Sequence, residues 1–185
     1  MTKYVTFSVI ILFIILNAGC TITHEFGPFM GKVVDAGTGE PIEGAVILIV
    51  FSIESSSLGG SVNSFADAIE TLTDAQGEFK FTPKRINFFK MNASWDDDYQ
   101  VSIFKPGYGA YPGHRQAYSS WKKDEQSLVI PENKYIIYYL PKLANLKERK
   151  ENLLNIRKPI AIPSEKMPNM LKLESSEYEV VGLKP

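Results

Sequence analysis

Seven consecutive small or apolar residues, Ala45 to Phe51, place the strongest constraint on how this chain folds. An apolar run of this length between turn signals is typical of a strand buried on both faces, because a helix needs more residues. The preceding segment offers turn chemistry: Gly39 and Gly44 accept positive φ at no steric cost, and Pro41 fixes φ at about −65°. We therefore predict strand, tight turn and buried strand across residues 31–51.

A second hairpin is indicated by residues 70–81. Asp74 and Gly77 occupy the first and fourth positions of a type I turn, which are the residue types that this turn prefers. Alternating apolar and polar residues follow at 78–81 and recur at 99–103, and a last apolar run covers 135–140. At least six short strands separated by turns predict an all-β sandwich.

Three motifs carry a family resemblance: GKVVDAGTGEPIEGAVILIV at 31–50, TDAQGEFKF at 73–81 and YQVSIFKPGYGAY at 99–111. In this order they resemble the carboxypeptidase regulatory-like domain. The resemblance covers roughly residues 29–140 and implies a seven-stranded, immunoglobulin- or transthyretin-like (prealbumin-like) sandwich that is generally non-catalytic. The positions that match are Gly31, Asp35, Thr38, Gly39, Pro41, Ile42, Gly44, Ala45, Thr73, Asp74, Gly77, Phe79, Gly107 and Tyr108.

The first twenty residues have the anatomy of a secretory signal, with Lys3 ahead of an apolar run at 5–16 and small residues before Cys20. The apolar run falls short of the roughly twenty residues that span a bilayer. Cys20 is the chain's single cysteine, and its place resembles the lipobox of bacterial lipoproteins, although Asn17 stands where leucine is usual. The resemblance implies cleavage after residue 19 and acylation of Cys20. The alternative is an uncleaved membrane anchor with an incidental cysteine.

A lipid-anchored protein of this kind lies outside the cytoplasm. Thr21 follows the cysteine, whereas aspartate there marks inner-membrane retention, so we expect the outer membrane if the organism has one. The formal net charge of −1 gives no electrostatic reason to expect a nucleic-acid partner.

Candidate chemistry is sparse. His24 and His114 are the two histidines, too few with an acylated cysteine for a zinc site, and no nucleophile elbow accompanies them. The aspartates at 96–98 lack the spacing of calcium ligands, and a solvated turn is the preferred interpretation. We expect no catalytic residue, no metal and no cofactor.

The segment 106–123 is the most suggestive for binding, since it gathers rings and polar groups in an expected loop. Exposed aromatic rings suit a sugar or a protein partner, whereas rings that cap the core are the alternative. The candidate residues are Tyr108, Tyr111, His114, Arg115, Tyr118 and Trp121. A second polar loop is expected at 52–67, and residues 85–98 give no clear period.

At the C-terminal end, leucines at helical spacing predict an amphipathic helix over 142–158, covering the sandwich or, since it is net basic, touching anionic lipid. Prolines and scattered charge predict an extended tail. The predicted organisation is a signal peptide at 1–19, a tether at 20–27, the sandwich at 28–141, the helix at 142–158 and the tail at 159–185. We expect a membrane-tethered, non-catalytic binding or assembly module with an envelope protein or carbohydrate as partner. The alternatives are a structural envelope lipoprotein without ligand and an accessory protein that binds or hydrolyses carbohydrate.

Overall fold

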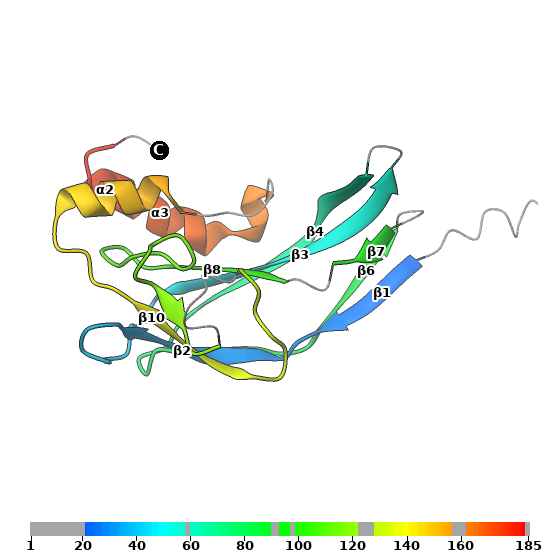
Figure 1. Cartoon of the computed structure of the whole chain (residues 1–185), viewed down its shortest axis with the longest axis horizontal. Helices are drawn as coiled ribbons and strands as arrows, with labels where there is room; N and C mark the ends of the chain where they lie inside the picture. The colour runs from blue at the N-terminus through cyan, green and yellow to red at the C-terminus, as the bar shows by residue number, and fades with distance from the viewer. Residues whose placement is uncertain are drawn as a thin grey trace, which may run out of the picture.

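A computed structural model of the chain describes residues 21–57, 60–89, 93–96, 99–121, 128–156 and 162–183. The predicted signal peptide and Cys20 lie outside these residues. The described part is mainly β-strands with two α-helices (Figure 1), in agreement with the all-β, sandwich-like prediction. The elements are β1 Thr21–Phe26, β2 Phe29–Asp35, β3 Val46–Ser57, β4 Gly60–Leu72, β5 Glu78–Phe81, β6 Lys84–Phe89, β7 Ala93–Trp95, β8 Gln100–Phe104, β9 Tyr118–Ser119, β10 Tyr135–Leu140, α2 Leu146–Leu154, the 3₁₀ turn η1 Ser164–Lys166, and α3 Pro168–Val180.

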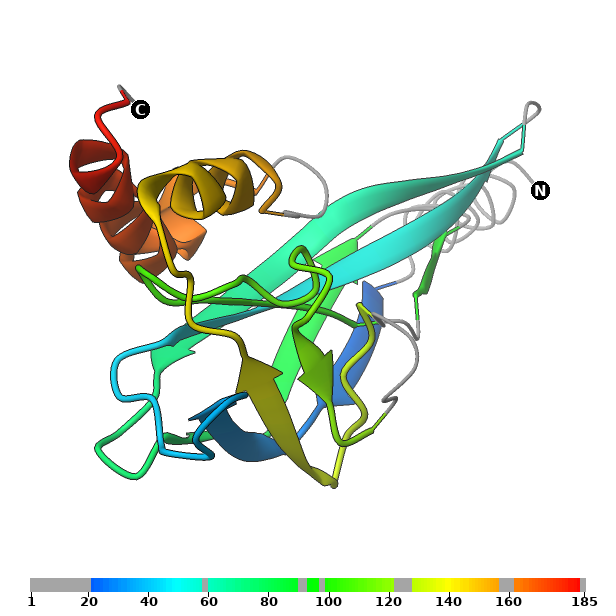
Figure 2. The ribbon, with the colours of Figure 1, turned by 60° about the vertical axis from the view of Figure 1, so that its left-hand side comes forward.

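Two four-stranded arrangements make the layers. The first sheet has the order β5-β2-β10-β9, with β2 and β10 parallel and the other pairs antiparallel. In the second sheet β3 pairs with β4 on one side and with β7 and β8 on the other, all antiparallel. A separate ribbon, β1-β6, extends the body at one end. The helices α2 and α3 lie over the outer face of the second sheet (Figure 2).

The apolar run at the start of β3 is the centre of the molecule, and the prediction that it is buried on both faces is confirmed. Its alternate residues Ile47, Ile49 and Phe51 join the core between the sheets. The residues between them, represented by Leu48, pack under the helices. Every side chain from Val46 to Phe51 is at most 1% exposed.

The predicted polar loop at 52–67 is wrong, because β3 and β4 continue through it as one long hairpin with a register shift after Phe51. Backbone hydrogen bonds hold such a ladder whatever the side chains are, so a Ser- and Gly-rich composition does not exclude it. The second hairpin predicted at 70–81 has its turn at 74–77, but the strands on either side of that turn do not pair with each other. Residues 68–72 of β4 pair with β3, and β5 pairs with β2.

The predicted tether at 20–27 is folded from Thr21 onward. β1 pairs with β6 from Thr21↔Phe89 to Phe26↔Lys84. Phe26 is 1% exposed, and its ring lies 4.5 Å from that of Phe51. Burial of this one large ring fixes the end of the strand to the core, which composition alone does not reveal.

The C-terminal part contains two α-helices, α2 and α3. Asn145 caps α2 by accepting from the backbone N–H of Glu148, and Leu153 is buried while Leu146 and Leu154 are exposed, so the predicted leucine stripe covers less than expected. The extended tail is wrong for 168–180, where α3 begins with Pro168 in its first turn, a position at which proline costs no helical hydrogen bond.

Polar contacts fasten the two helices to the sandwich and to each other. The carboxylate of Glu70 in β4 accepts from the N–H groups of Asn169 and Met170, so a strand supplies the cap of α3. Arg149 of α2 makes a bidentate ion pair with the fully buried Glu177 of α3.

Asp67 of β4 adds a second fastening at the edge of the same sheet. Its carboxylate lies 2.7 Å from the ammonium groups of both Lys84 and Lys166. Burial alone raises the pKa of Asp67, but hydrogen bonds from Lys166, Lys84 and the Ala68 N–H outweigh it, and the pKa lies below its usual value. The η1 turn that carries Lys166 is thereby held against β4.

Candidate functional site

The turn residues singled out in the sequence are structural. Gly77 has a φ of +74°, and a Cβ there would lie 2.5 Å from the carbonyl oxygen of Val33. Its N–H donates to the carbonyl of Asp74, whose carboxylate accepts from the N–H groups of Gln76 and Glu78. Gly39 and Gly44 also have positive φ, and Pro41 bridges to Val34. These residues shape the two turns that carry the chain from one sheet to the other.

The aromatic rings of the 106–123 segment do not gather in one place. Tyr111 is 2% exposed, and its ring lies 5.0 Å from that of Tyr138 in the core, so it is the core-capping alternative that describes this ring. Burial raises the pKa of Tyr111, against the effect of a hydrogen bond with Ser119. Tyr108 is half-buried, and burial together with the nearby Asp35 carboxylate raises its pKa.

Tyr118 and Trp121 lie elsewhere, with Tyr118 on the outer face of the first sheet. Tyr118 stacks on Tyr139 of β10 with ring centroids 4.5 Å apart and planes 9° from parallel. Trp121 is 39% exposed, and the ammonium of Lys134 lies 3.6 Å from its ring centre. Residues 122 and 123 of the predicted loop lie outside the described residues.

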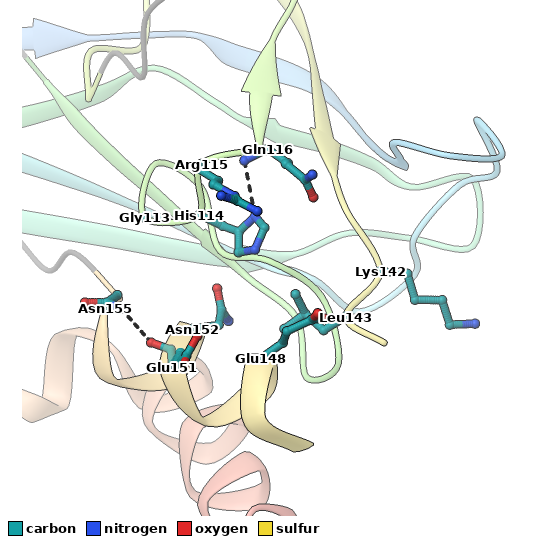
Figure 3. A pocket seen from close by; sticks show the side chains of 10 residues that line it. All are labelled: Gly113, His114, Arg115, Gln116, Lys142, Leu143, Glu148, Glu151, Asn152 and Asn155. Carbon is teal, nitrogen blue, oxygen red and sulfur yellow. Dashed lines mark hydrogen bonds between the residues drawn. The ribbon is translucent and has the colours of Figure 1, made fainter. Parts of the chain in front are cut away.

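The remaining two candidates, His114 and Arg115, line a cleft of about 480 Å³ between the loop and α2, which we call the loop–helix cleft. Figure 3 shows the loop residues on one side of it and the α2 residues on the other. Its lining consists of Gly113, His114, Arg115, Gln116, Lys142, Leu143, Glu148, Glu151, Asn152 and Asn155.

The imidazole of His114 is held on the loop side. A Cβ on Gly109 would lie 2.6 Å from the Cγ of His114, so a residue without a side chain is needed beneath the ring. The N–H of Gln116 donates to Nδ1 of His114 over 3.2 Å, which makes Nδ1 an acceptor and leaves the ring proton on Nε2. Burial, assisted by Arg115 and opposed by Glu148, lowers the pKa of His114, so the ring is neutral at pH 7.

The helix side is fixed by Asn152, which is 4% exposed. Its Oδ1 accepts from the N–H of Ala110 over 2.8 Å, and its Nδ2 donates to the carbonyl of Tyr108 over 3.1 Å. One amide therefore satisfies two backbone groups of the loop, and it sets the width of the cleft. Glu148 accepts from the N–H of Ala144 at the start of the helix.

The charges of the lining balance. Arg115 and Lys142 are cations and Glu148 and Glu151 are anions, while His114 is neutral. The described lining residues provide both donors and acceptors at the rim and together carry no net charge, which suits a neutral hydroxylated or dipolar ligand better than a strong anion or cation. None of these described residues is a serine, threonine or cysteine that could serve as nucleophile.

Among the described residues, no group of three or more His, Cys, Asp or Glu side chains is placed to hold a metal ion. Asp96 lies within the described residues, and Asp97 and Asp98 lie outside them. None of the helices in the described ranges combines the length and the apolar character that a bilayer crossing requires.

Comparison with family models, with curated proteins and with solved structures finds no match for this chain. The resemblance to the carboxypeptidase regulatory-like domain therefore stays a prediction that rests on the motifs at 31–50, 73–81 and 99–111.

The sequence indicated one wall of the cleft and missed the other. The 106–123 segment contains His114 and Arg115, but Glu148, Glu151 and Asn152 come from a helix that was expected to cover the sandwich or to touch anionic lipid. Asn145 followed by Glu148 signals a helix start. No sequence signal places that helix opposite residue 114.

Proposed function

We propose that this protein is a lipid-anchored, extracytoplasmic binding module of the bacterial envelope, without catalytic activity. We further propose that its body is a seven-stranded sandwich of the carboxypeptidase regulatory-like type, elaborated by extra strands and two helices. Its binding site is the loop–helix cleft, and its ligand is a neutral or dipolar polar group such as a sugar unit or a polar segment of an envelope protein.

The single observation that carries the binding proposal is the cleft with opposed walls. Arg115 stands on the loop wall and Glu151 on the helix wall, and both side chains are exposed. The walls are kept apart by the Asn152 hydrogen bonds, so the site is preformed, and a ligand loses little affinity to ordering of the protein.

The binding proposal is tested with N-acetylhexosamine oligosaccharides and envelope extract as probes. Wild type is compared with a variant that combines Arg115→Ala with Glu151→Ala, and with a matched control that combines Lys172→Ala with Glu179→Ala on the exposed side of α3. Binding is followed by calorimetry for the sugars and by cross-linking for the extract.

We expect the cleft variant to lose binding at least tenfold, which corresponds to about 1.4 kcal/mol, while the control retains it. If wild type and cleft variant capture the same molecules with the same affinity, the cleft is not the binding site, and a structural lipoprotein without specific ligand becomes the better account.

The lipid anchor is supported by the apolar run at 5–16 and by Ala18-Gly19 directly before Cys20. Two or more acyl chains bind a bilayer far more tightly than one chain, since each buried methylene contributes about 0.8 kcal/mol. Replacing Cys20 with Ala is expected to move the protein from the membrane fraction to the soluble fraction. Unchanged fractionation contradicts the lipoprotein proposal.

A further inference from the structure

No linker separates the proposed anchor residue from the folded part of the chain. β1 begins at Thr21, the residue directly after Cys20, and Thr21 is already paired with Phe89 of β6. The ribbon is joined to the core by Phe26, and the centroid of the Phe26 ring lies 5.0 Å from that of Trp95. Any attachment at residue 20 therefore acts on a folded strand, and not through a flexible linker.

The same end of the molecule holds the tip of the β3–β4 hairpin. Ser55 pairs with Ala93 of β7, and Figure 1 places the start of β1 at this end. The hairpin residues at 55–56 and 60–66 include no charged side chain, and Val62 is 51% exposed. Two carboxylates lie beside them: Glu54 pairs with Asn63, and Asp96 accepts from the Asn63 amide. The tip itself therefore presents hydroxyl groups and an apolar side chain.

The opposite end of the molecule is acidic. The adjacent turns at 35–44 and 73–78 hold five carboxylates, at Asp35, Glu40, Glu43, Asp74 and Glu78. The turns themselves contain no lysine or arginine, and one ammonium, that of Lys105, lies beside Gly44. The two turns are joined by hydrogen bonds such as that from Gly44 N–H to the carbonyl of Thr73. An anionic lipid surface repels this end.

We infer that the sandwich stands end-on against an anionic phospholipid surface, with the β1 start and the β3–β4 hairpin facing the headgroups. The inference rests on the proposed lipid anchor at Cys20. It combines the place where the undescribed N-terminal segment joins the fold with the uncharged hairpin tip at that end and the cluster of carboxylates at the other.

The end-on orientation determines how far the loop–helix cleft lies from the lipid headgroups. β3 contains 12 residues and runs from the acidic end to the hairpin tip; at about 3.3 Å per residue it is roughly 35 Å long. Gly109 lies between His114 and Pro141, and Pro141 follows the Leu140↔Asp35 pair at the acidic end. The loop–helix cleft is therefore held roughly 30 Å from the headgroups, the distance implied by that strand length.

The test uses the full-length lipidated protein in vesicles of phosphatidylethanolamine and phosphatidylglycerol that contain a nitroxide-headgroup lipid. Because Cys20 is the single cysteine and is acylated, Val62→Cys and Glu43→Cys each introduce one free thiol for a fluorophore. Both parent side chains are exposed. Each labelled protein is also prepared with Cys20→Ala as the unanchored control.

We expect the label at position 62 to be quenched several-fold more than the label at position 43, and neither to be quenched in the unanchored controls. Equal quenching, or stronger quenching at position 43, overturns the end-on orientation while co-flotation of the wild type with the vesicles still upholds the anchor. A wild type that does not float with the vesicles overturns both.

Discussion

The outer faces of the two sheets differ in what covers them. On the second sheet, Val46, Leu48 and Val50 point outward, yet each is at most 1% exposed because α2 and α3 pack over them. On the first sheet, the outward residues of β10 include Tyr135, which is 49% exposed, and Ile137, which is half-buried. An unbroken apolar strand thus indicates two covered faces, whereas an alternating burial pattern indicates one.

The two faces also differ in the side-chain contacts made on them. At the edge of the covered face, Glu70 caps α3 and Asp67 binds Lys84 and Lys166, so each carboxylate has a partner supplied by the fold. On the open face the comparable contact is the stacked pair Tyr118 and Tyr139. Charge holds the added layer in place, whereas aromatic side chains on the open face contact each other, as in this stack, or a nearby carboxylate, as where the Tyr135 hydroxyl donates to Glu78.

The largest contrast is expected between matched truncations on the two faces. Leu48→Ala should lower the free energy of unfolding by about 2–5 kcal/mol, because it opens a cavity under the helices. Ile137→Ala should cost about 1 kcal/mol or less, since a half-buried side chain gains only part of the 1.5–3 kcal/mol of full burial. Urea unfolding at pH 7 measures both, and similar losses would contradict the assignment of covered and open faces.

A smaller effect is expected for Asp67→Asn, which removes a charged partner from Lys84 and Lys166. We expect a loss of about 1–2 kcal/mol at pH 7, reduced by the solvent exposure of the two lysines. Because the folded state lowers the pKa of Asp67, its contribution is present above the ordinary value of 3.8 and is lost as the pH falls through the folded-state pKa.

Between pH 7 and pH 2, the free energy of unfolding should therefore decrease less steeply for the Asp67→Asn variant than for wild type. Glu43→Gln, on an exposed turn, serves as the control and should leave the wild-type profile unchanged. Parallel profiles for wild type and the Asp67 variant would show that this carboxylate does not fasten the helical layer.

The smallest effect is expected on the open face. A double-mutant cycle with Tyr118→Ala and Tyr139→Ala should give a coupling free energy of about 0.5–1.5 kcal/mol for the stacked rings. A coupling of zero, measured by the same urea titrations, would mean that the two rings contribute independently to stability.

Sequence patterns predicted the elements in which the residue types themselves indicate burial or a special backbone conformation. The β3 run was recognised because all its residues are apolar, and the turn at 74–77 because Gly77 has a conformation that glycine adopts freely. The outer half of the β3–β4 hairpin was missed because its ladder consists of backbone groups, to which serine and glycine contribute like any residue.

The second helix of the covering layer, α3, and the place of α2 as one wall of the cleft were missed for a different reason. α3 is capped by Glu70, about a hundred positions earlier in the chain, and α2 is latched through Asn152 to the backbone of residues 108 and 110. Contacts between distant segments leave no periodic signal in either one. The loop wall was predicted from its composition, and the helix wall required the tertiary structure.

The Asn152 latch has a consequence for how this architecture can change over time. Because one amide of α2 sets the position of that helix on the loop, the acidic side of the recess belongs to the exposed face of α2, which can vary while the buried face that packs on the second sheet is kept. New ligand preferences can therefore arise by altering one helical face, while the scaffold and its mode of attachment are inherited unchanged.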